Sequence, residues 1–243
     1  MTTSKDNDLK NYIMQALQSD FDKIADNNVS VAFYRHRASG RFLTVRTSSH
    51  RNDEVYRLLK GRELPNLPQI YEVCSDESGL IVLEEYVDGI SLLEEMNGCP
   101  LSMHRACHVA FQICEALNSL HALGVIHRDI KPSNIILRPD DTAVLIDLSI
   151  ARMISDRQDH DTQNLGTIGY AAPEQFGLSQ SGQATDIYAL GVLLNVMLTG
   201  AHPTIAQPKN FILRRIVSRC VTVQMSRRYA SARQVQKALK LFV

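Results

Sequence analysis

The stretch HRDIKPSN, residues 127–134, places an acid, a lysine and an amide in one short polar segment between two apolar runs. These groups are Asp129, Lys131 and Asn134. A carboxylate can accept a proton, an ammonium can hold a phosphate group, and an amide oxygen can ligate a hard cation. That combination suits phosphoryl transfer, which depends on positioning and charge neutralisation. The stretch therefore predicts this chemistry, and the rest of the chain must support it.

Length and composition limit the possible classes of protein. The 243 residues, 44% of them hydrophobic, suffice for one large domain or two small lobes without metal or disulfide support. The 26 basic residues balance the 26 acidic ones, which removes the broad electrostatic argument for nucleic acid or an anionic membrane as partner. Five cysteines without a CxxC pair favour a reducing, cytoplasmic location. With no long apolar run and no secretion signal, we expect no membrane segment.

The first third of the chain predicts one helix followed by a small sheet. Apolar residues recur at helical spacing in LKNYIMQALQSDF (9–21), so an amphipathic helix over residues 1–19 should pack on the protein or on a partner. A hairpin is predicted around Ser39-Gly40, then a short helix after Asn52/Asp53 and two further strands. The predicted strands of this part are residues 29–35, 41–47, 70–75 and 80–86.

The remaining two thirds predict mainly helices. A long buried helix should begin after Ser102 and end at Gly124, followed by two short strands around the Asp140-Asp141 turn. Three helices should then complete the chain. The predicted strands are 135–139 and 143–147, and the predicted helices are 186–200, 213–221 and 231–242.

Four segments of this helical part occur in a fixed order. After the opening stretch come Asp147-Leu148-Ser149, then GTIGYAAPE (166–174), then DIYALG (186–191). Together they resemble the C-lobe of eukaryotic-like (Hanks-type) bacterial serine/threonine protein kinases. One HRD tripeptide would be weak evidence, whereas four ordered motifs at this spacing are specific. The resemblance covers roughly residues 20–240.

The resemblance implies roles for the motif residues. Asp129 is expected to orient and deprotonate the substrate hydroxyl, and Lys131 to steady the γ-phosphate, as in kinases of the Ser/Thr type. Asn134 and Asp147 are expected to hold Mg²⁺ through oxygen ligands. Ile136 is expected to line the nucleotide site.

Other motif residues are expected to hold the catalytic loop in shape. The resemblance implies that Thr167 touches the catalytic aspartate and that Glu174 pairs with Arg228 of SRRYAS. Asp186 should support the loop through its backbone, and the ring of His127 should stack into the core beneath it.

The first lobe departs from the family pattern at its phosphate-binding elements. RFLTVR places Arg46 where a lysine pairs with the nucleotide, and EVYRLLK makes Glu54 the carboxylate partner. An arginine keeps the charge but is planar and favours bidentate pairing with carboxylates. ADNNVSV (25–31) contains no glycine, so the usual close approach of backbone to phosphate is not available.

A second departure lies in VLEEYVDG (82–89). Glu84 takes the gatekeeper position at the back of the adenine pocket, with Glu85 and Tyr86 on the hinge. A buried carboxylate needs a partner. We therefore hypothesise that Arg46 is held between Glu54 and Glu84.

The segment from Asp147 to Glu174 carries two further predictions. Leu148-Ser149 replaces the Phe-Gly of the family, and leucine can fill the same apolar slot. Arg128 can pair with a phosphate on this segment, for which Thr162 is the predicted site.

Beyond the segment, residues 203–213 leave room for only a very short loop where such kinases carry an extra docking helix.

These observations predict an α+β, two-lobed protein kinase fold. Its small antiparallel sheet lobe should cover residues 20–86, and its larger, mostly helical lobe residues 87–243. The expected function is transfer of the γ-phosphate of Mg-ATP to serine or threonine hydroxyls of proteins, with reduced activity. The alternative is a pseudokinase that acts as a nucleotide-binding or scaffolding module.

Overall fold

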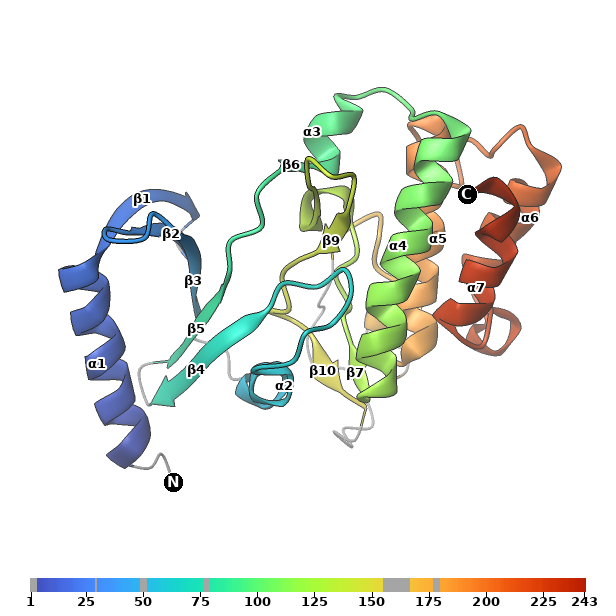
Figure 1. Ribbon diagram of the computed structural model, residues 1–243. Coiled ribbons are helices and arrows are strands. Elements are labelled where there is room, and N and C mark those ends of the chain that lie inside the picture. The colour runs from blue at the N-terminus through green and yellow to red at the C-terminus, as the bar shows by residue number, and fades with distance from the viewer. Residues whose placement is uncertain (1–3, 29, 49–51, 77–78, 155–166, 177–179) are drawn as a thin grey trace. The chain divides into compact units, whose positions relative to one another are not determined.

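The computed structural model describes residues 4–28, 30–48, 52–76, 79–154, 167–176 and 180–243 (Figure 1). The chain divides into two compact units. The first, here called the sheet unit, comprises Met1–Leu64 and Pro68–Val87, and the second, the helical unit, comprises Pro65–Leu67 and Asp88–Val243. The helix predicted over residues 1–19 is thus part of the sheet unit.

The sheet unit contains five antiparallel strands in the order β1-β2-β3-β5-β4 and two helices. Their bounds are α1 (Ser4–Asp20), β1 (Phe21–Asn28), β2 (Val31–His36), β3 (Phe42–Ser48), α2 (Asp53–Leu59), β4 (Ile70–Asp76) and β5 (Gly79–Glu85). The predicted hairpin is confirmed, with Gly40 in the left-handed region at φ 70°. Strand β1 was not predicted. It is an edge strand, and its exposed residues 22–26 show no alternating apolar pattern.

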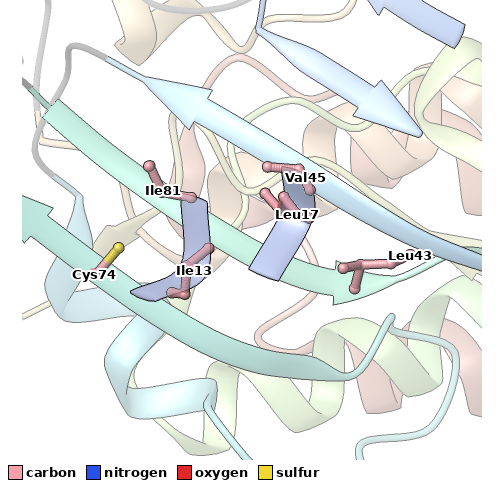
Figure 2. Close-up of a cluster of buried hydrophobic side chains, with 6 residues drawn as sticks. All are labelled: Ile13, Leu17, Leu43, Val45, Cys74 and Ile81. Atoms are coloured by element: carbon pink, nitrogen blue, oxygen red, sulfur yellow. The ribbon is translucent and has the colours of Figure 1, made fainter. Parts of the chain in front are cut away.

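Helix α1 covers one face of this sheet. Ile13 and Leu17 on the helix pack against Leu43, Val45, Cys74 and Ile81 of three strands, and all six are buried (Figure 2). Two ion pairs fix the helix at its first half, since Lys10 contacts Asp76 at 2.6 Å and Asp6 contacts Arg57 of α2 at 2.9 Å. The apolar stripe of α1 is therefore used within the sheet unit, and a partner at its outer face stays a prediction.

The helical unit is built around α4 and α5 (Figure 1). Helix α4 begins where predicted, because the Ser102 side chain accepts a hydrogen bond from Arg105 N. A side chain at Gly191 of α5 would place its Cβ 2.3 Å from that of Cys220, so only glycine permits this approach of α6. The helices are α3 (Leu92–Met96), α4 (Met103–Ala122), α5 (Gln183–Thr199), α6 (Phe211–Cys220) and α7 (Ala232–Leu239).

Short strands and 3₁₀ turns connect these helices. The strands are β6 (Ile90–Ser91), β7 (Val125–Ile126), β8 (Ile135–Leu137), β9 (Ala143–Leu145) and β10 (Arg152–Met153). The turns are η1 (Pro132–Asn134), η2 (Pro173–Phe176), η3 (Met225–Arg227) and η4 (Lys240–Phe242). The strands predicted at 135–139 and 143–147 are confirmed but shorter, and β6, β7 and β10 are two residues long, too short for a periodic signal.

Residues 65–67 belong to the helical unit although they lie in the range predicted for the first lobe. Asn66 explains this, because its side-chain Nδ2 donates to the Gln112 side chain at 3.0 Å and to the Ala143 carbonyl at 2.8 Å. Its own carbonyl accepts from Leu145 N at 2.8 Å.

Within the described ranges, no helix combines the length and the hydropathy that a membrane crossing requires.

Truncation of the α1 core side chain tests whether α1 is an integral part of the sheet unit. Leu17→Ala should lower the free energy of unfolding by about 2–5 kcal/mol, because it leaves a cavity between helix and sheet. Gln15→Ala, at an exposed position of the same helix, is the matched control and should have little effect. Urea denaturation measures both, and equal stability of the two variants would contradict the packing.

Candidate active site

One carboxylate holds the backbone of the loop that carries the predicted catalytic residues. Asp186, in the first turn of α5, is fully buried, and its two oxygens accept from His127 N at 2.9 Å and Arg128 N at 2.8 Å. His121 Nε2 lies 2.8 Å from the same carboxylate. Burial opposes charge on Asp186, but these hydrogen bonds outweigh it, so its pKa is lowered. The predicted support role of Asp186 is confirmed.

The loop conformation is itself unusual at Arg128. Its φ is 72°, a left-handed conformation that a non-glycine residue rarely adopts. The Gln175 side chain stabilises this backbone, since Nε2 donates to the Arg128 carbonyl at 3.0 Å and Oε1 accepts from Ala172 N at 3.0 Å. Gln175 is completely buried, and the sequence reasoning missed it. The only signal in the sequence was a glutamine directly after the Ala-Pro-Glu motif.

Three side chains converge on the carboxylate of Asp129. Thr167 donates its hydroxyl to Oδ1 at 2.7 Å, and Lys131 Nζ lies 2.7 Å from Oδ2. Lys131 also donates to the Thr167 hydroxyl at 2.8 Å. Asn134 Nδ2 donates to Oδ2 and to the Asp129 carbonyl, both at 2.9 Å. The predicted contact between Thr167 and Asp129 is confirmed, and the Asp129 carboxylate is held by charged and neutral donors.

The two predicted metal ligands are tied together through the backbone. Ile146 N, next to Asp147, donates to the Asn134 carbonyl at 2.8 Å. Asp147 itself has φ 71°, and its Oδ1 accepts from Ser149 N at 3.1 Å. The two Asn134 side-chain bonds use Nδ2 as donor, so neither of them involves the amide oxygen. An amide oxygen and a carboxylate are ligand types that fit Mg²⁺.

His127 lies beneath this loop. Its ring is fully buried, with Nε2 3.2 Å from the Ile146 carbonyl, as expected for a structural residue. Burial lowers the pKa of His127, which favours the neutral ring although three carboxylates oppose this effect.

A buried ion pair fixes the segment that follows. Arg228 Nη1 and Nη2 donate to the two oxygens of Glu174 at 2.6 and 2.9 Å, and the Thr185 hydroxyl donates to the same carboxylate at 2.9 Å. The guanidinium also lies 4.9 Å from the ring centroid of Tyr188. The predicted Glu174–Arg228 pair is confirmed. Thr162, the predicted phosphorylation site, lies outside the described residues.

In the sheet unit, Arg46 pairs with Glu84. Thr44 of β3 lies opposite Glu84 of β5, so Arg46, two residues along, shares the face of Glu84. Its Nη2 and Nε donate to Glu84 Oε1 at 3.0 and 3.3 Å. The two side chains are only 9% and 6% exposed. This half of the predicted arrangement is confirmed, and it occupies the face opposite α1.

The other half of that hypothesis is wrong. Glu54 is an exposed residue in the first turn of α2, whereas the Arg46 side chain is buried and donates to Glu84. The neighbouring Asp53 is the acid of this turn that contacts the sheet, since it accepts from the Ser75 hydroxyl at 3.1 Å. Glu54 is therefore not placed as the carboxylate partner that the family pattern suggested.

The remaining predicted nucleotide-site residues lie in two groups. Glu85 accepts from Gln69 N at 3.2 Å, and Tyr86 has Phe33 and Phe42 at ring-centroid distances of 5.4 and 5.1 Å, all in the sheet unit. Ile136 is half-buried in β8 of the helical unit. The β1–β2 pairing continues to Asn28 on β1 and Val31 on β2, so only two residues lie between the two strands. The family pattern places a glycine-rich loop here, and the sequence of this part has no glycine.

Comparison with known proteins gives a family match. Residues 35–243 match the family described as protein kinase domain. A probable serine/threonine-protein kinase PknB of Lactococcus lactis is 34% identical over 141 residues, which are 57% of this chain and 22% of that protein. Serine/threonine-protein kinase D of Synechocystis is 29% identical over 201 residues, or 74% of this chain and 39% of that protein.

A third relative is also named a serine/threonine-protein kinase. Serine/threonine-protein kinase PknB of Mycobacterium tuberculosis is 37% identical over 126 residues, which cover 50% of this chain and 20% of that protein. The matched part of this chain thus spans between a fifth and two fifths of these relatives.

The buried Arg46–Glu84 pair can be tested by a double-mutant cycle. Arg46→Met and Glu84→Met should each lower the free energy of unfolding by about 3–5 kcal/mol, because each leaves a buried charge without this ion-pair partner. The double variant should lose less than the sum of the two, by up to about 3 kcal/mol. Urea denaturation of the four proteins gives the coupling, and strict additivity would show that the pair contributes nothing.

Proposed function

Because the chain belongs to the protein kinase family, we propose that it transfers the γ-phosphate of ATP to serine or threonine hydroxyls of a protein substrate. The observation that carries this proposal is the contact set of Asp129, Lys131 and Thr167, with all three distances between 2.7 and 2.8 Å. Such a set places a proton acceptor beside a cation on one loop.

Asp129 is the group suited to orient the substrate hydroxyl and take its proton. Its two oxygens are already oriented by Thr167 and Asn134. Little further conformational entropy of the Asp129 side chain is therefore lost when a substrate binds. As the substrate oxygen forms its bond to phosphorus, the bond to the leaving diphosphate breaks and the hydroxyl proton passes to Asp129. Lys131, next to the same carboxylate, can stabilise the negative charge of the phosphoryl group during its transfer.

Asn134 and Asp147 are the residues that would hold Mg²⁺. The hydrogen bond between Ile146 N and the Asn134 carbonyl keeps the two ligand-bearing segments in register. When bound, the metal neutralises charge between the β- and γ-phosphates. Thr167 Oγ1 joins Lys131 to Asp129 and thus couples the loop to the segment on which protein kinases place their substrate.

A pseudokinase is the second candidate, and the sheet unit favours it. Arg46, the cation in the position of the nucleotide-pairing lysine, donates two hydrogen bonds to Glu84, and Glu54 is exposed. To bind a phosphate with the same donors, Arg46 must leave a buried carboxylate, which is costly. Nucleotide binding without productive transfer is the function that this arrangement would support.

The names of the relatives suggest the acceptor class. The three proteins compared above are named serine/threonine-protein kinases, and Lys131 in the catalytic loop agrees with the same class. Because the chain matches only part of each relative, the substrate of the whole protein is itself part of this proposal. A cytoplasmic location and a partner at α1 stay predictions.

Intact-mass measurement after incubation with Mg-ATP separates the two candidates. Wild-type protein should gain phosphate on itself or on an added protein substrate, and Asp129→Asn should slow this about 10²–10⁴-fold because the proton acceptor is lost. Asp140→Asn, an exposed aspartate in the β8–β9 turn, is the matched control and should keep the wild-type rate.

Each contrary result has a distinct meaning. Equal phosphate gain by Asp129→Asn would remove Asp129 from the chemistry. No phosphate gain by the wild type, either on itself or on added protein substrates, would favour the pseudokinase, and nucleotide binding would then be the property to measure.

A further inference from the structure

The charges of this chain are segregated along the sequence although the total is balanced. Residues 201–243 contain nine lysines and arginines and no aspartate or glutamate, whereas the first 200 residues contain all 26 acidic residues and 17 basic ones. One of the nine, Arg228, is buried in its pair with Glu174. The other eight are exposed: Lys209, Arg214, Arg215, Arg219, Arg227, Arg233, Lys237 and Lys240.

Five of these cations lie on the outer faces of two packed helices, and the other three, Lys209, Arg227 and Lys240, lie on the adjoining segments. Helix α6 buries Leu213, Ile216, Val217 and Cys220, so its arginines at 214, 215 and 219 are on the opposite side. Helix α7 likewise buries Ala232, Val235 and Leu239. Helix α6 packs on α5, α7 packs on α4, and α6 and α7 contact each other (Figure 1). The apolar faces are thus used in the core, and the cationic faces point outward.

Large apolar side chains are exposed among these cations. Phe211 is 64% exposed at the start of α6, beside Ile212, and Arg214 lies over the Phe211 ring at 5.8 Å. Val223 and Leu241, on the segments after α6 and α7, are 72% and 80% exposed. Exposed apolar groups combined with cations match a partner that offers anionic groups at its surface and hydrocarbon beneath them.

We propose that the α6–α7 face, defined by these eight exposed cations with Phe211, Ile212, Val223 and Leu241, binds the surface of a membrane that contains anionic lipids. The absence of any acidic residue from 201–243 means that no carboxylate of this segment neutralises the face. Nucleic acid is the less favoured partner, because the exposed apolar groups are mostly aliphatic, while recognition of bases relies on aromatic stacking. This surface contact does not depend on the proposed phosphotransfer.

Sedimentation with phosphatidylcholine vesicles, with and without phosphatidylserine, tests the proposal on the whole chain. Wild-type protein should bind the vesicles that contain phosphatidylserine, and added salt should weaken this binding. Replacing three cations of α6 with Arg214→Gln, Arg215→Gln and Arg219→Gln should weaken it about 100-fold. Phe211→Ser should weaken it about tenfold while leaving the charge unchanged.

A matched control uses three exposed arginines of the sheet unit. The triple change Arg35→Gln, Arg41→Gln and Arg62→Gln removes the same charge from positions outside the α6–α7 face and should leave vesicle binding unchanged. All replaced side chains are exposed, and thermal melting of each variant shows whether it is folded.

Three outcomes would overturn the proposal. The first is no binding of wild-type protein to anionic vesicles, and the second is equal weakening by the control and by the α6 variant. The third is binding to duplex DNA or RNA at the same salt without vesicle binding, which would make this face a nucleic-acid surface instead.

Discussion

The geometry of the loop at residues 127–134 depends on the carboxylate of Asp186. It is completely buried, yet it remains the acceptor for the backbone amides of His127 and Arg128 and for the ring of His121. A charge at such depth is stable only when its hydrogen bonds are satisfied. These bonds hold the backbone immediately before Asp129, and Gln175 holds the Arg128 carbonyl from the other side. The left-handed φ of 72° at Arg128 is the consequence, because two fixed partners impose a conformation that the residue alone would avoid.

The two units differ in how closely they follow the family pattern. In the helical unit, Asp129, Lys131, Asn134 and Thr167 form a connected set within which each side chain orients the next. In the sheet unit, Arg46 is engaged with Glu84 on the face opposite α1. Phosphoryl transfer depends more on charge placement than on covalent chemistry, so a complete loop with an altered phosphate-binding sheet is compatible with slow transfer. The same alteration is also the argument for a module that binds nucleotide without transfer. Whether Arg46 leaves Glu84 when a nucleotide is present therefore distinguishes slow transfer from nucleotide binding without transfer.

Much of the fold was predictable because its signals are local. The 3.6-residue spacing of apolar residues located α1, α4, α5, α6 and α7, and the Ser39-Gly40 turn located the β2–β3 hairpin. Strand β1 could not be found in this way, because an exposed edge strand lacks the alternation that burial imposes. At the candidate site, ordered motifs identified the contacts of Asp186, Thr167 and Glu174. Gln175 escaped prediction because it bonds a backbone distant in sequence, and Glu54 was misplaced because the register of β3 and β5 delivers Glu84 to Arg46 instead.

Replacing Asp186 with asparagine, and measuring nucleotide affinity and phosphate transfer side by side, tests most directly whether Asp186 positions Asp129. Asparagine keeps the shape but replaces one acceptor oxygen with a donor, so one of the loop contacts must be lost. We predict a folded protein, by circular dichroism and melting, with unchanged nucleotide affinity and transfer slowed about 100-fold, the loss expected when a reacting group is displaced by about 1 Å. Wild-type transfer in this variant, or a loss explained entirely by weaker nucleotide binding, would contradict the claim that Asp186 positions Asp129.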